Sequence, residues 1–182
     1  MSPLVVEKPV RNHSSRQGRP ILLVSVHSTA SGRLIPWEDE ETGTLRWFDN
    51  PASDASAHVV IPRTVEEVWR CVDDEQASWT VEGLNPISLN LEFVHRLPGS
   101  PDEEERVTES QLVRGAWQVA QWCRRYELLP ERTDIDGMGI VGHGDIPPEF
   151  NTGRHWDPGP FFDWDTFIAL VKQWFSVNMV PG

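Results

Sequence analysis

The chain has 182 residues, of which 38% are hydrophobic and 24% are charged, and its formal net charge is −12. This length suits one domain with a sizeable core, and the composition excludes a disordered chain. The negative charge argues against a nucleic-acid partner, because phosphate contacts need clustered Lys and Arg, and no apolar run approaches the roughly 20 residues that a membrane span needs.

The first 19 residues contain no continuous apolar segment followed by small residues, so we expect no secretory signal. We predict that residues 1–19 form a ragged, partly ordered arm and that residues 20–178 form the single domain. Cys71 and Cys123 are the only cysteines. One pair cannot build a disulfide scaffold, so the sequence favours two buried, reduced thiols.

Residues 20–27, PILLVSVH, are a short β-branched apolar run that predicts a buried strand ending on His27. The segment 28–56 consists mostly of turn-forming and acidic residues. Its aromatic residues are Trp37, Trp47 and Phe48. We therefore expect an irregular excursion there.

Three further segments follow. Residues 56–62 predict a second strand, and residues 65–72 fit either a helix or a strand, with their Val and Trp content favouring a strand. Residues 87–95 alternate apolar and polar side chains, which predicts a half-buried strand with Glu92 on its polar face.

The second half of the chain contains two helix signals and one strand signal. Thr108 and Gln111 form a capping box before an amphipathic helix, and Asp163 is the expected N-cap of a last helix. Residues 137–143 predict a short strand ending on His143. These elements indicate an α/β (α+β) fold, in which helices flank a central mixed sheet in one domain.

Two predicted strands thus deliver a histidine at their ends, His27 and His143, and Asp157 follows in the loop beyond. Two imidazoles and a carboxylate around an open position are typical of a catalytic zinc. Spacing alone is weak evidence, because a single histidine at a strand end is more often a hydrogen-bonded structural residue.

Several motifs in order give a stronger signal. The sequence resembles the zinc-dependent N-acetylmuramoyl-L-alanine amidases of the type-2 amidase family, which includes phage endolysins and peptidoglycan recognition proteins. The motifs that carry the resemblance are VHST (26–29), SAHVVI (56–61), NPISLNLEFV (85–94), TESQ (108–111), IVGHGDI (140–146) and DPGPFFDWDTF (157–167).

This resemblance implies a mixed sheet flanked by helices and one Zn²⁺ per chain, held by His27, His143 and Asp157 in a surface groove. It also implies that a zinc-activated water cleaves the amide between N-acetylmuramic acid and L-alanine of the stem peptide in peptidoglycan. Glu92 falls where the bacterial enzymes keep an acidic residue near the metal, and we expect it to carry the proton from the water to the departing amine.

The chain departs from the family pattern at two positions. Many relatives have a lysine two residues before the third ligand, where this chain has His155, and we assign stabilisation of the oxyanion to that histidine. Its reference pKa of about 6.5 would make any charge it supplies depend on pH. Some phage members have a tyrosine where this chain has Ala57, so Glu92 is the expected route for the proton.

Three residues are weaker candidates. His58 falls at a position that faces the same region in the family, and we expect it to line the substrate groove, with a purely structural role bracing the site as an equal alternative. Trp79 and Asn85 precede the Glu92 strand in the loop that forms the groove in the family, and we expect them to contact the substrate.

The resemblance is greatest to an endolysin catalytic domain. An endolysin without a signal peptide would stay in the host cytoplasm until released to the wall, and a separate wall-binding domain would belong to the full protein. The alternative function is a non-catalytic domain that binds muropeptide without cutting it. Such domains lose zinc ligands, whereas this chain keeps all three, so catalysis is favoured.

Overall fold

The computed structural model describes residues 2–29, 35–96 and 106–177, and it contains a mixed six-stranded sheet. The strands lie in the order β1 (Leu4–Glu7), β5 (Glu67–Arg70), β4 (Val59–Ile61), β7 (Ser88–Phe93), β3 (Leu23–Ser28) and β8 (Ile140–Gly142). Strands β4, β7, β3 and β8 run parallel to one another, and β1 runs parallel to β5, whereas β4 and β5 are antiparallel. The predicted central mixed sheet is therefore confirmed.

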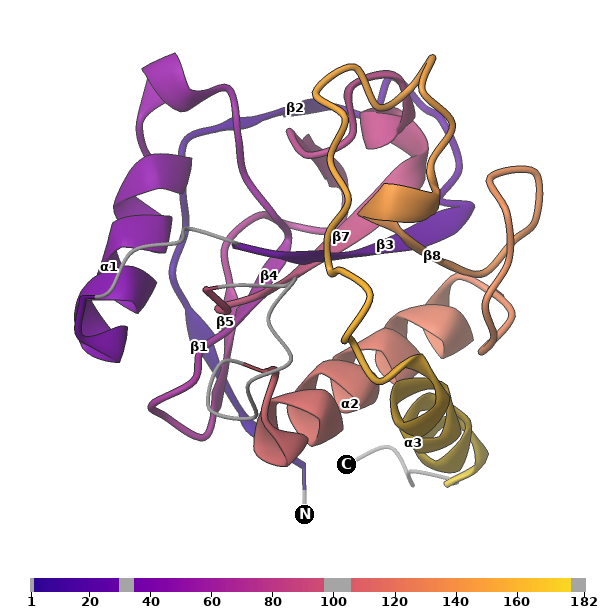
Figure 1. Cartoon of the computed structure of the whole chain (residues 1–182). Helices are drawn as coiled ribbons and strands as arrows, with labels where there is room; N and C mark the ends of the chain where they lie inside the picture. Colours follow the sequence, from indigo (N-terminus) through magenta and orange to yellow (C-terminus); the bar gives the residue numbers. More distant parts are fainter. Residues whose placement is uncertain (1, 30–34, 97–105, 178–182) are drawn as a thin grey trace.

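Within the described ranges, three α-helices lie around this sheet: α1 (Trp37–Phe48), α2 (Glu109–Arg125) and α3 (Trp164–Ser176). Figure 1 shows α2 and α3 packed side by side on one face of the sheet, with the loop that precedes α3 crossing from the other side. The described residues also form the antiparallel pair β2 (His13–Ser15) and β6 (Gln76–Ser78) and the short 3₁₀ turns η1 (Pro51–Ser53), η2 (Glu82–Ile87) and η4 (His143–Asp145).

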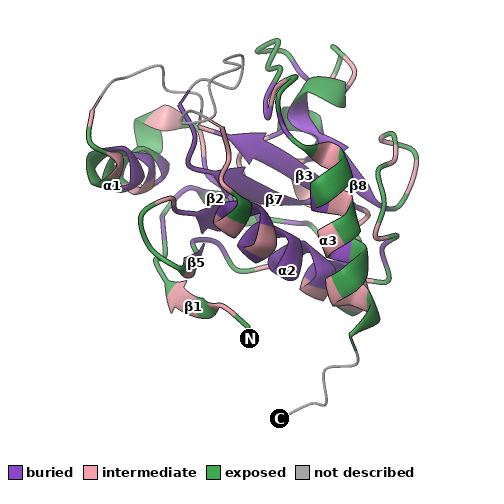
Figure 2. Ribbon diagram, turned by 60° about the horizontal axis from the view of Figure 1, so that its bottom comes forward, coloured by how far each residue is buried: buried purple, intermediate pink, exposed green. Residues whose placement is uncertain are grey.

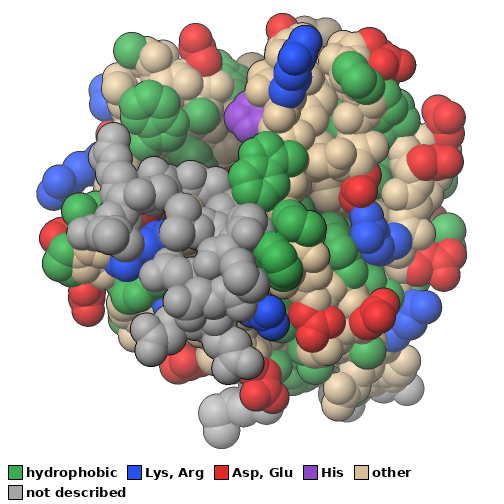
Figure 3. Space-filling model, in the orientation of Figure 1, with side chains coloured by type: hydrophobic (Ala, Val, Ile, Leu, Met, Phe, Trp, Pro, Cys, Tyr) green, Lys and Arg blue, Asp and Glu red, His purple; other side chains and the backbone are tan. Residues whose placement is uncertain are grey.

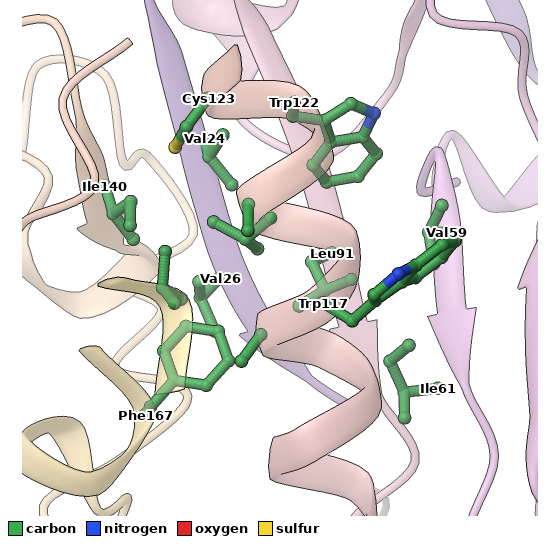
Figure 4. Close-up of a cluster of buried hydrophobic side chains, with 14 of the residues drawn as sticks. Val24, Val26, Val59, Ile61, Leu91, Trp117, Trp122, Cys123, Ile140 and Phe167 are labelled. Carbon is green, nitrogen blue, oxygen red and sulfur yellow. The ribbon is translucent and has the colours of Figure 1, made fainter. Parts of the chain in front are cut away.

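The main core lies between the sheet and α2. The predicted capping box is confirmed, because the Thr108 side chain accepts from the Gln111 backbone and Gln111 reaches back to the Thr108 N–H. Figure 4 shows Leu91 of the sheet beside Trp117 of α2, and Val26 beside Phe167 of α3. The Asp163 cap of α3 is also confirmed.

Both cysteines are buried and free, as the sequence predicted. Burial raises the pKa of the Cys71 and Cys123 thiols to about 12, so both stay protonated at neutral pH. Across the described ranges, no helix has the length and apolar character needed to cross a bilayer.

The irregular segment expected between residues 28 and 56 is wrong, because α1 occupies residues 37–48. The inward face of this helix has buried Glu40, Glu41 and Thr44 beside Phe48. Apolar periodicity was absent because buried polar side chains take the positions that apolar residues usually fill. Glu41 accepts hydrogen bonds from the backbone N–H groups of Arg63 and Thr64 and from the Thr64 hydroxyl.

The N-terminal residues also form regular structure rather than a ragged arm. Strand β1 pairs in parallel with β5 at the edge of the main sheet, and β2 pairs with β6. Just beyond β2, Arg16 is buried and donates hydrogen bonds to the backbone carbonyls of Asp74, Pro86 and Ser88. These contacts tie the N-terminal segment to the loop that leads into β7.

Strand β7 is wholly buried, so the half-buried strand predicted for residues 87–95 is also wrong (Figure 2). The alternation is real, but the polar face does not meet solvent. Asn90 hydrogen-bonds to Ser78 and His27, and Glu92 faces a groove. A central strand between two neighbours can be polar on one face only if that face has buried partners.

Gly115 permits the close approach of α2 to β7, because a Cβ there would lie 2.5 Å from Phe93 Cζ. We expect Gly115→Ala to lower the free energy of unfolding by about 1–3 kcal/mol, since overpacking outweighs the gain in helix propensity. Gly43→Ala is the matched control, because no atom lies within 4 Å of the new Cβ. It should stabilise by about 0.5–1 kcal/mol. Urea unfolding of both variants tests this, and a stabilising Gly115→Ala would contradict it.

Candidate metal centre and groove

The parallel strands β3, β7 and β8 bring His27, Glu92 and His143 together at their carboxyl ends. Strand β3 contributes His27, and η4 begins at His143 directly after β8. Glu92 of β7 is the Cα partner of His27 in the parallel register, so the two side chains point to the same face. The carboxyl ends of parallel strands are where the open sheets of α/β proteins place their ligands.

The donor atoms of His27, His143 and Asp157 lie close together and are buried. The two Nδ1 atoms are 3.1 Å apart. Asp157 Oδ2 lies 3.4 Å from His27 Nδ1, and its Oδ1 lies 3.3 Å from His143 Nδ1. A tetrahedral zinc with bonds of about 2.0–2.1 Å separates its ligand atoms by about 3.3 Å. The donor set therefore fits a zinc ion in both chemistry and spacing.

Surrounding groups fix these donors. The Nε2 atom of His27 lies 3.2 Å from Asn90 Oδ1, so a proton on Nε2 would leave Nδ1 free to bind a metal. The Ser28 backbone N–H donates to Asp157 Oδ2 over 3.2 Å. Sequence reasoning missed Asn90, because an amide on the polar face of a strand has no local signature.

A buried asparagine, Asn151, organises the loop between the last two donors. Its side-chain nitrogen donates to the backbone carbonyls of His143 and His155, and its oxygen accepts from the His155 N–H. The Gly144 N–H donates to the Asp157 carbonyl over 2.8 Å. A Cβ at Gly144 would lie 2.9 Å from the Trp156 backbone, so this close crossing requires glycine. Sequence reasoning missed Asn151 for the same reason as Asn90.

The electrostatics of the cluster favour the metal-binding protonation states. Burial lowers the pKa of His143 despite the opposing effect of Asp157, which favours the neutral imidazole that binds metals. Burial alone would raise the pKa of Asp157, but hydrogen bonds from His143 and His27 lower it well below its usual range. Burial, followed by the charge of Asp157, raises the pKa of Glu92 well above its usual value.

A groove of about 710 Å³ opens over this cluster. It is lined by all three donors, Glu92, His155 and Trp79. Asn85 lines an adjoining hollow with Trp79 and His155, but its side-chain oxygen is occupied by the N–H groups of Thr80 and Val81. Figure 3 shows a histidine side chain at the surface beside a hollow flanked by hydrophobic side chains.

His155 lies against the cluster but remains half exposed. Its ring stacks on that of His143, with the centroids 4.4 Å apart, and its Nδ1 lies 3.8 Å from Asp157 Oδ1. Burial, followed by the neighbouring His143, lowers its pKa. The ring is therefore neutral at neutral pH, and it can donate a hydrogen bond to a group in the groove but supplies little positive charge.

His58 is fully buried and lines neither the groove nor the adjoining hollow, so the expectation that it lines the groove is wrong. Its Nε2 lies 2.8 Å from an Arg16 nitrogen, and its Nδ1 accepts from the Asn90 backbone N–H. Because Asn90 in turn contacts His27, His58 braces the site from behind. This was the alternative that the sequence left open.

Comparison with known proteins agrees with this geometry. The sequence profile of the N-acetylmuramoyl-L-alanine amidase family matches residues 17–160, a range that includes all three donors and Glu92. The chain belongs to this family. The amidase is 24% identical over 166 residues to N-acetylmuramoyl-L-alanine amidase A of Achromobacter lyticus, which covers 81% of this chain and 89% of the relative.

Solved structures share the fold of the amidase. The Staphylococcus aureus hydrolase AmiA, crystallised with its ligand, has a TM-score of 0.70 at 20% identity over 96% of this chain and 84% of its own. An AmpD derivative has a TM-score of 0.64 at 24% identity, with 93% and 94% covered. LysCS, an endolysin amidase of Clostridium intestinale, has a TM-score of 0.59 at 15% identity, with 94% and 97% covered.

The buried His58 predicts a pH dependence of stability. Burial and the charge of Arg16 lower its pKa from 6.5 to about 3. Between these values the unfolded chain binds a proton that the folded chain does not. The titration of His58 therefore does not affect the free energy of unfolding above pH 6.5. As the pH falls from 6.5 towards 3, it lowers that free energy by up to about 1.4 kcal/mol per pH unit.

We expect the free energy of unfolding to fall less steeply between pH 6.5 and 4.5 in His58→Gln than in the wild type, measured by urea unfolding at each pH. His13→Gln is the control, because His13 is exposed in β2 and its variant should keep the wild-type slope. Parallel curves for the wild type and His58→Gln would show that His58 does not cause this pH dependence.

Proposed function

We propose that the amidase uses one Zn²⁺, held by His27, His143 and Asp157, to hydrolyse the amide between N-acetylmuramic acid and L-alanine of the stem peptide. The observation that carries this proposal is the separation of the three donor atoms, 3.1–3.4 Å, which suits tetrahedral zinc. Two imidazole nitrogens also favour zinc over Mg²⁺ or Ca²⁺, which prefer oxygen ligands.

A bound zinc would supply a Lewis acid that lowers the pKa of a water molecule and polarises the scissile carbonyl. The residues of the chain supply the proton transfers. Glu92 faces the same groove from the strand next to His27, where its carboxylate can accept a proton from the attacking water. The same carboxyl group can then pass that proton to the departing amine.

His155 is the proposed donor to the carbonyl oxygen as negative charge develops there. It lines the groove beside the donor cluster, and stacking on His143 holds its ring in place. The neutral imidazole offers a hydrogen bond in place of the charge that a lysine would bring. Two further residues are proposed to contact the substrate next to His155. Trp79 lines both the groove and the adjoining hollow, and Asn85 lines the hollow.

The finer biological role that we propose is that of an endolysin, released from the host cytoplasm to degrade the wall and joined in its full form by a wall-binding domain. The shared fold with LysCS, which is described as an endolysin, supports this role. The alternative of a recognition domain that does not cut is disfavoured, because the three donors and Glu92 are all present and converge on one groove.

Metal content tests the donor set. The purified protein should hold about one zinc per chain by metal mass spectrometry, and chelation should abolish release of stem peptides from purified peptidoglycan until zinc is restored. His143→Ala should lose the metal, whereas His13→Ala, a change at an exposed histidine outside the site, should keep it. A metal-free wild type that still hydrolyses the amide would contradict the proposal.

Glu92→Gln separates proton transfer from metal binding. The substitution keeps the shape of the side chain but removes the base, so the turnover number should fall by about 10²–10⁴-fold while zinc content stays unchanged. Glu131→Gln, a change at an exposed residue, should keep wild-type turnover. If Glu92→Gln retained full activity, the proton would have to pass through His155 or another group.

A further inference from the structure

Helix α1 forms one wall of the groove, and the proposed mechanism gives this wall no role. Asp39, Glu40 and Trp47 of this helix line the same groove as the three donors, and Asp54, after η1, lines it too. With Glu92 and Asp157, the described lining residues include five carboxyl groups. No described Lys or Arg lines this groove or the adjoining hollow.

Glu40 is the unusual member of this wall. Only 5% of its surface is exposed, yet within the described ranges its carboxylate has no hydrogen bond or ion pair. The adjacent Glu41 is buried to a similar degree, but it accepts three hydrogen bonds from Arg63 and Thr64. The Glu40 oxygens are not among the fully buried atoms, so this unpaired carboxylate faces the groove and is open to a ligand.

The charged groups of the substrate limit which group can pair with Glu40. Stem peptides carry carboxylates and a diamino acid whose side-chain amine is cationic when it is not acylated, whereas the N-acetylated sugars are neutral. Away from the metal ligands, the described lining residues Asp39, Glu40 and Asp54 have no Lys or Arg among them, so this wall repels carboxylates and attracts an ammonium group. Trp47 adds an exposed aromatic face on the same wall, which also attracts cations.

We propose that Glu40, assisted by Asp39, binds the free side-chain ammonium of the stem peptide and makes the amidase selective for stems in which this amine is not acylated. This inference rests on the proposed function, because it places the stem peptide in the groove beside the metal centre. Helix α1 would then distinguish substrates with a cationic side-chain amine from substrates in which this amine is acylated and neutral.

Two synthetic muramyl peptides test the proposal with the zinc-loaded protein. They are identical except that the diamino acid has a free amine in one and an N-acetylated amine in the other. The wild type should show a kcat/KM about tenfold higher for the free amine, in line with a charged hydrogen bond in a partly buried site. Glu40→Gln should reduce this ratio to near one by slowing the free-amine substrate alone.

Glu38→Gln is the matched control, because Glu38 lies in the first turn of α1, is exposed and does not line the groove. It should keep the wild-type ratio. Asp39→Asn, a change at an exposed position, should lower the ratio partly, and it keeps the test valid if Glu40→Gln does not fold.

The outcomes distinguish this inference from the proposed function. Equal turnover of the two substrates by the wild type, or a loss in Glu40→Gln that is the same for both, would overturn the role of Glu40 and leave the amidase chemistry intact. No turnover of either substrate by the zinc-loaded wild type would overturn the proposed function and this inference with it.

Discussion

The parallel pairing of β3 with β7 and β8 is the constraint on which the site depends. It brings His27 at the end of β3 to His143 just after β8, and it sets Glu92 beside His27. A slip of one residue in β7 would turn Glu92 to the helix-covered face. The same strand packs Leu91 and Phe93 against α2, so the apolar core fixes the register in which the polar face serves the site.

A chain of buried polar contacts connects the N-terminal segment to the candidate metal centre. Arg16 contacts His58, the Asn90 backbone donates to His58, and the Asn90 side chain lies 3.2 Å from His27. Each group in this series is buried, so leaving any one without its partner would cost about 1–3 kcal/mol. This cost favours a single arrangement of the His27 ring, and a preorganised ligand loses less entropy when it binds a metal.

The sequence predicted those parts of the fold whose signal is local. The strands near residues 20–27 and 137–143 and the helices after Thr108 and Asp163 follow from apolar runs and caps. Helix α1 was missed because carboxylates fill its inward face. The three donors came from the order of several motifs. The supporting roles of Asn90 and Asn151 exist only through contacts made in the folded chain, so no sequence pattern could reveal them.

The charge of the protein acts differently over long and short distances. At −12, the amidase should be repelled by anionic wall polymers, but salt screens that repulsion beyond about 8 Å. Glu40 lines the groove directly, and only 5% of its surface is exposed to solvent. The electric field of its carboxylate is therefore screened far less inside the groove. A net charge that opposes adhesion to the wall is therefore compatible with a groove that attracts one cationic group, because the two effects act at different distances.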